Sequence, residues 1–183
     1  MALVIFDYDG VLADTLDDLI RFGQQACDQL GVKHAVTKDD LSNLEVMSFA
    51  TFGKACEVPE HRIEEFVNIS LKLFAEKESP PAIFDGLSEI IKHLSSKHNI
   101  AIVTTNSSQN VHAFLAHHGL DNLVHAVYGV DTPGSKAQKI SLARERFMEE
   151  SVFMIGDALS DVRAAKEAGV TSIAVTWGHQ SLE

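Results

Sequence analysis

The chain opens with Leu3-Val4-Ile5-Phe6-Asp7-Tyr8-Asp9-Gly10, an apolar run that leads into two carboxylates and a glycine. A short apolar run bounded by charge and glycine predicts a strand buried on both faces of a parallel sheet. Asp7 should then stand at the carboxyl end of that strand, where open α/β sheets bind their ligands. Because side chains alternate along a strand, Asp7 and Asp9 can converge only if the chain turns after Asp7, which Gly10 permits.

The composition indicates a folded chain with an anionic surface. The sequence has 183 residues, of which 45% are hydrophobic, and its formal net charge is −11. Such a chain is not expected to bind nucleic acid, because that affinity depends on clustered Lys and Arg. An anionic substrate would need a local cation, for which a divalent metal is the natural choice. Two cysteines, no basic leader with a cleavage site and no apolar run of membrane-spanning length favour a reduced, cytoplasmic protein that does not enter membranes.

Apolar periodicity divides the chain into a helical block and a region of alternating strands and helices. Between residues 15 and 78 the spacing predicts helices only, the first of them capped by Asp14 or Thr15 and ended by Gly31. Pro80-Pro81 ends this block, since consecutive prolines force extended backbone. From there we expect helices at 87–96, 109–118, 136–147 and 161–168, and strands at 100–103, 126–128, 152–155 and 171–175.

This alternation predicts an α/β fold with a doubly wound parallel sheet. The helical block interrupts the pattern after the first strand, so we expect a core at 1–14 plus 82–183 and a small all-helical cap domain at 15–81. Because the insertion leaves the core next to Asp7 and Asp9, it should overhang the carboxyl ends of the strands. The two connections are expected to form a hinge that closes over a substrate.

Three predicted strands end in polar residues that suit phosphoryl transfer. Carboxylates can hold a hard cation, a hydroxyl and an amide can bind phosphate oxygens, and an ammonium can neutralise charge. The set comprises Asp7 and Asp9, then Thr104, Thr105 and Asn106, then Asp157 and Asp161, with Lys136 and Lys139 near the start of the helix before the last of these strands.

These motifs, in this order, resemble the haloacid dehalogenase superfamily over nearly the whole chain. Residues 6–11 are similar to its first motif, Val103-Thr104 to its second, Lys136 to its third and 156–161 to its fourth, while 164–169 and 175–178 resemble its phosphatase branch. The resemblance implies a Rossmann-like core with the small helical cap of the phosphoglycolate phosphatase and phosphoglucomutase relatives. The Lys-Pro pair common in the third motif is missing here.

The resemblance implies a phosphatase that hydrolyses a small phosphorylated metabolite through an aspartyl phosphate. Asp7 would be the nucleophile, and Asp9 the acid that protonates the leaving oxygen and then activates water. Thr104 would donate to a phosphoryl oxygen, with Gly10, Thr105 and Asn106 lining the same place.

The implied cofactor is Mg²⁺, held by Asp7, the backbone carbonyl of Asp9, and Asp157, with Asp161 helping directly or through water. Lys136 would pair with the nucleophile and the transferring group, and it is favoured because it stands nearer the loop. Lys139, one helical turn on, is the competing assignment.

Two other functions remain open at this stage. Asp9 distinguishes phosphatases and phosphomutases from dehalogenases within the resemblance, so a phosphosugar mutase is the enzymatic alternative. A phospho-accepting receiver or a silent binding module is the alternative of another class, because receivers also combine an aspartate, a threonine and a lysine on a parallel sheet. The sequence contains no signature for the particular ester or for the oligomeric state.

Overall fold

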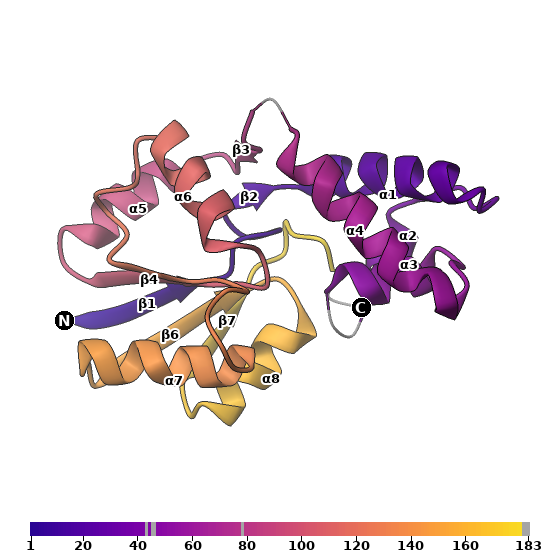
Figure 1. Cartoon of the computed structure of the whole chain (residues 1–183). Coiled ribbons are helices and arrows are strands. Elements are labelled where there is room, and N and C mark those ends of the chain that lie inside the picture. Colours follow the sequence, from indigo (N-terminus) through magenta and orange to yellow (C-terminus); the bar gives the residue numbers. More distant parts are fainter. Residues whose placement is uncertain (43, 45–46, 78, 181–183) are drawn as a thin grey trace.

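The computed structural model describes residues 1–42, 44, 47–77 and 79–180. Its main sheet has five parallel strands in the order β5-β4-β1-β6-β7, with β1 at the centre (Figure 1). The strands are β1 (Ala2–Phe6), β4 (Asn99–Val103), β5 (Ala126–Tyr128), β6 (Ser151–Gly156) and β7 (Thr171–Ala174). The predicted α/β fold with a doubly wound parallel sheet is therefore confirmed.

Helices cover both faces of this sheet (Figure 1). Helices α5 (Leu87–Ser95) and α6 (Ser108–His117) pack on one face, and α7 (Lys136–Phe147) and α8 (Leu159–Glu167) pack on the other. The alternation of side chains along β1 divides its residues between the two layers: Val4 and Phe6 face α5 and α6, whereas Leu3 and Ile5 face α7 and α8. Because β1 is packed on both faces, its carboxyl end is held in place, and Asp7 follows directly at that end.

The predicted helical block lies beyond the carboxyl end of β1 (Figure 1). It contains α1 (Leu16–Leu30), α2 (Asp39–Ser42), α3 (Phe49–Ala55), the 3-10 turn η1 (Glu60–Arg62) and α4 (Ile63–Ala75). These elements enclose a hydrophobic cluster of their own, which includes Phe52, Phe66 and both cysteines, Cys27 and Cys56. Gly31 ends α1 in the left-handed conformation, as expected. No helix among the described residues is long and apolar enough to cross a membrane.

A short antiparallel ribbon forms the two connections between the helical block and the sheet. It pairs β2 (Ala13–Asp14) with β3 (Ala82–Ile83), and the Phe84 amide donates to the Leu12 carbonyl at 3.1 Å beside it. The sequence analysis did not predict this ribbon, because two-residue strands are too short to show a period. The ribbon brings the entry and exit of the block side by side.

Candidate active site

A tight turn after β1 places the first two carboxylates. The Asp7 amide still donates to the Ile155 carbonyl of β6 at 2.8 Å, so this residue continues the sheet. The chain then folds back, with the Tyr8 carbonyl accepting from the amides of Leu12 and Ala13 at 3.0 and 2.9 Å. Gly10 has a φ of +76°, and a Cβ on it would overlap the Asp157 side chain. Glycine at this position therefore allows the turn and the close approach of the next acidic residue.

Three aspartates from two strand ends form an acidic group. Oxygens of Asp7, Asp157 and Asp161 all lie within 4.8 Å of one another. Asp161 sits in the first turn of α8, where its Oδ2 accepts from the Ala158 amide at 3.1 Å, and Asp157 Oδ2 accepts from the His179 amide at 2.6 Å. Carboxylate oxygens are the ligands that Mg²⁺ takes in proteins, so this donor set fits such an ion. The Asp9 carboxylate lies outside the group.

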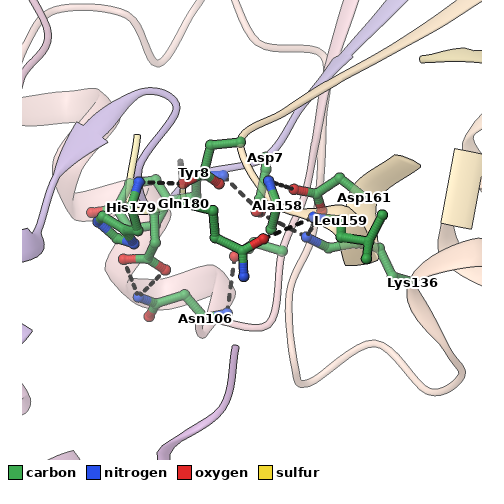
Figure 2. Close-up of polar contacts among 12 residues, drawn as sticks. Asp7, Tyr8, Asn106, Lys136, Ala158, Leu159, Asp161, His179 and Gln180 are labelled. Carbon is green, nitrogen blue, oxygen red and sulfur yellow. Dashed lines mark hydrogen bonds and ion pairs between the residues drawn. The ribbon is translucent and has the colours of Figure 1, made fainter. Parts of the chain in front are cut away.

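Lys136, at the first position of α7, is the cation that contacts the acidic group. Its Nζ lies 2.9 Å from Asp7 Oδ2 and 2.5 Å from Asp161 Oδ1. Figure 2 shows these three side chains converging from separate elements. Lys139 is turned away, because its Nζ donates to the Gly129 carbonyl at 2.6 Å. Of the two lysines left open by the sequence, the geometry places Lys136 beside the acidic residues.

Burial controls the ionisation of this group. It raises the pKa of Asp7 to about 8, although the attraction of Lys136 opposes the change. Burial also raises the pKa of Asp157, against the His179 amide that favours its ionised form. For Lys136 burial acts to lower the pKa, but Asp7 and Asp161 outweigh it and raise the value. Three carboxylates beside one ammonium leave an excess of negative charge, which a divalent cation would compensate.

The loop after β4 brings the second predicted motif to the Asp9 side of the site. Asn106 Nδ2 donates to Asp9 Oδ2 at 3.1 Å, and the Asn106 amide donates to Thr104 Oγ1 at 3.0 Å. Thr104 is buried, whereas Thr105 is exposed. Asn106 therefore positions the Asp9 carboxylate, and Thr105 is the predicted site residue that the structure leaves in solvent.

The segment after β7 contributes two residues that the sequence analysis missed. The imidazole Nε2 of the buried His179 lies 3.3 Å from the Thr15 hydroxyl, and the Gln180 Oε1 accepts from the Leu159 amide at 2.9 Å. The Gln180 Nε2 donates to the Leu44 carbonyl in the helical block. Figure 2 draws His179 and Gln180 in the same network of polar contacts as Asp7, with Gln180 bonded to Leu159. Thr15 and Leu44, which His179 and Gln180 contact, lie more than 130 residues away in the sequence, and Leu159 lies on another element. The only sequence signal for these two site residues was their position directly after the 175–178 motif.

A parallel sheet whose central strand ends in a buried aspartate, beside two more aspartates and a lysine, is the arrangement expected of a hydrolase that transfers phosphoryl groups. The family described as haloacid dehalogenase-like hydrolase matches residues 4–175. The chain belongs to this family, which confirms the resemblance seen in its motifs.

Individual relatives agree with this assignment. A phosphoglycolate phosphatase from Synechococcus elongatus is 27% identical over 181 residues, covering 97% of this chain and 85% of the relative. The tyrosine-protein kinase PtkA of Mycobacterium tuberculosis is 25% identical, and the match covers 97% of this chain but 62% of that protein. A solved haloacid dehalogenase-like hydrolase from Streptococcus pneumoniae has the same fold, with a TM-score of 0.85, 22% identity, and coverage of 98% of this chain and 87% of the other. The chain is thus a haloacid dehalogenase-like hydrolase, and phosphatases are among its relatives.

Proposed function

We propose that the chain hydrolyses a small phosphate monoester in a Mg²⁺-dependent reaction through an aspartyl phosphate on Asp7. The observation that supports this most is the contact of Lys136 with Asp7 Oδ2 inside the acidic group, since it sets a cation beside a buried carboxylate whose other oxygen is oriented by the Tyr8 amide at 2.8 Å. The phosphoglycolate phosphatases among the relatives support a small phosphorylated substrate.

The reaction divides into two displacements on the same aspartate. In the first, a carboxylate oxygen of Asp7 bonds to phosphorus while the ester oxygen leaves and takes a proton from Asp9. In the second, Asp9 removes a proton from water, whose oxygen bonds to phosphorus and releases phosphate and the free Asp7 carboxylate. The hydrogen bond from Asn106 orients Asp9 for both proton transfers.

The surrounding residues act on charge and position. Lys136 offsets negative charge on the transferring group in a partly buried site, where charge is weakly screened. The Thr104 hydroxyl, which accepts from the Asn106 amide, keeps its own proton for a phosphoryl oxygen. Gly10, which has no Cβ to displace the Asp157 side chain, keeps the turn close to the phosphoryl-binding place. When bound by Asp7, Asp157, Asp161 and the backbone carbonyl of Asp9, Mg²⁺ would neutralise charge and orient the phosphate.

The helical block is proposed as a cap domain at 15–81 on a core of 1–14 plus 82–183. The β2–β3 ribbon supports this division, because it joins the two connections into one narrow link. The separate hydrophobic cluster of the block supports movement as a body. Such a cap would close over the ester and exclude bulk water from the aspartyl phosphate.

The test measures phosphate release from p-nitrophenyl phosphate and from a panel of phosphate monoesters with Mg²⁺. We expect many turnovers per chain, loss of release in Asp7→Asn, and unchanged release in the control Asp17→Asn, which alters an exposed carboxylate in α1. One equivalent of bound phosphate without turnover would instead indicate a receiver. Isomerisation of a sugar phosphate without net release would indicate a mutase.

A further inference from the structure

A cavity of about 250 Å³ lies between the helical block and the sheet domain. It is lined from the sheet side by Tyr8 and by Asn106, Gln109 and Asn110 around the start of α6, and from the block by residues of α1 and the end of α4. Figure 1 shows α1 and α6 on either side of the β2–β3 ribbon. This volume holds about eight water-sized groups, at about 30 Å³ each.

The cavity begins where the leaving group of an ester would emerge. Asn106 lines it and also donates to the Asp9 carboxylate at 3.1 Å. In the proposed reaction Asp9 touches the ester oxygen, so the remainder of the leaving group extends from Asp9 along Asn106 into this space. The size admits a leaving group of a few carbons.

Among the lining residues that the structure describes, the charged side chains are already paired. Lys77 is the cation among the lining residues, and its Nζ is bound to Asp18 Oδ2 with both side chains largely buried. The other oxygen of Asp18 accepts from Arg21 at 2.7 Å, but that guanidinium does not line the cavity and its side chain is 56% exposed to solvent. A carboxylate on the leaving group would have to displace Asp18 from Lys77 and would then lie close to two acidic side chains, Asp18 and Asp9.

The rest of the wall suits hydroxyl groups. The Asn106 carboxamide is engaged, because its Nδ2 donates to Asp9 and its Oδ1 accepts from the Ser107 amide at 2.8 Å and from Asn110 Nδ2 at 3.0 Å. The carboxamides of Gln109 and Asn110 each carry a donor and an acceptor, with one Asn110 hydrogen used on Asn106, and Asp18 carries acceptors. We propose that this cavity binds the leaving group and selects an uncharged, hydroxyl-bearing one, a small polyol, over one that carries a carboxylate. This inference rests on the proposed function and specifies its substrate class, in contrast to the phosphoglycolate named for several relatives.

The test compares kcat/KM for glycerol 1-phosphate and 2-phosphoglycolate. The wild-type chain should prefer glycerol 1-phosphate. Asp18→Asn releases Lys77 from its partner, so the ratio of kcat/KM values should shift toward 2-phosphoglycolate by about tenfold, the effect of about 1.4 kcal/mol. The double variant Asp18→Asn/Lys77→Gln removes both charges and should return the ratio to the wild-type value. Asp17→Asn changes the net charge equally at an exposed neighbour and should leave the ratio unchanged.

The outcomes separate this inference from the function on which it rests. A wild-type preference for 2-phosphoglycolate, or a ratio that Asp18→Asn does not move, would overturn the selection of polyols while phosphatase activity stands. If Asp18→Asn does not fold, the double variant still decides, because loss of the wild-type preference there contradicts the inference. Absence of release from both esters and from p-nitrophenyl phosphate would refute the proposed function and this inference together.

Discussion

The metal-free protein should become less stable as the pH rises, because Asp7 is held in a site that favours its protonated form. Its pKa is raised from 3.8 to about 8 in the folded chain, chiefly by burial. Between these values the folded state retains a proton that the unfolded chain has lost. The free energy of unfolding therefore falls with pH in this window, and the contribution of Asp7 is fully present only below pH 4.

Most of the magnitude follows from the Asp7 proton, and the raised pKa of Asp157 acts in the same direction. A single proton difference changes the free energy of unfolding by about 1.4 kcal/mol per pH unit, hence by about 4 kcal/mol between pH 5 and pH 8. The pKa of Lys136 is raised, so its stabilising contribution stays constant over this range. Mg²⁺ at 100 times its dissociation constant should restore about 2.7 kcal/mol by binding the folded state alone.

Urea unfolding at pH 5, 6, 7 and 8 with a chelator measures the slope. Asp7→Asn keeps the size of the side chain and removes its ionisation, so most of the slope should vanish and the variant should be more stable than the wild type at pH 8. Asp17→Asn, at an exposed carboxylate, should keep the wild-type slope. Equal wild-type stabilities at pH 5 and pH 8, or the same slope in Asp7→Asn, would refute the reasoning.

Four substitutions test other parts of the site. Asp9→Asn should slow alkyl phosphates more than p-nitrophenyl phosphate in steady-state assays, because p-nitrophenolate needs less protonation, and equal losses would argue against Asp9 as the acid. Lys136→Gln should lower kcat by about 10²–10³-fold, as loss of one charge-stabilising donor does. Lys139→Gln should instead lower the free energy of unfolding by about 1–3 kcal/mol, because it leaves the Gly129 carbonyl unpaired. A larger loss of kcat in Lys139→Gln than in Lys136→Gln would contradict the expectations for both lysines. Gly178→Ala adds a Cβ that would overlap Asp157, so the Mg²⁺ concentration for half-maximal activity should rise; an unchanged activation curve would count against Asp157 as a ligand.

The sequence revealed what is local and periodic. The apolar run before Asp7 predicted the central strand, and the polar residues after three strands predicted which side chains meet at the sheet edge, because parallel strands end together. The helix at 136–147 was predicted with the bounds that α7 has. These features depend on neighbours in the chain, and their signal is the spacing itself.

Contacts between distant segments could not be predicted in this way. The choice between Lys136 and Lys139 depends on how α7 is rotated against β1, which spacing alone does not determine. The pair of Asp18 with Lys77 joins residues 59 positions apart, and the contact of His179 with Thr15 spans 164 positions. Each of these requires the complete fold before its partners can be identified.

The two buried cysteines allow the local opening of the helical block to be measured by thiol labelling. The sequence has two cysteines, Cys27 and Cys56, both in the cluster enclosed by α1, α3 and α4. Burial raises the pKa of both thiols, so the reactive thiolate is scarce while the cluster stays packed. A thiol reagent can therefore label the chain only when these helices separate, and its labelling rate would record the local opening of the block while the sheet domain remains folded and unlabelled.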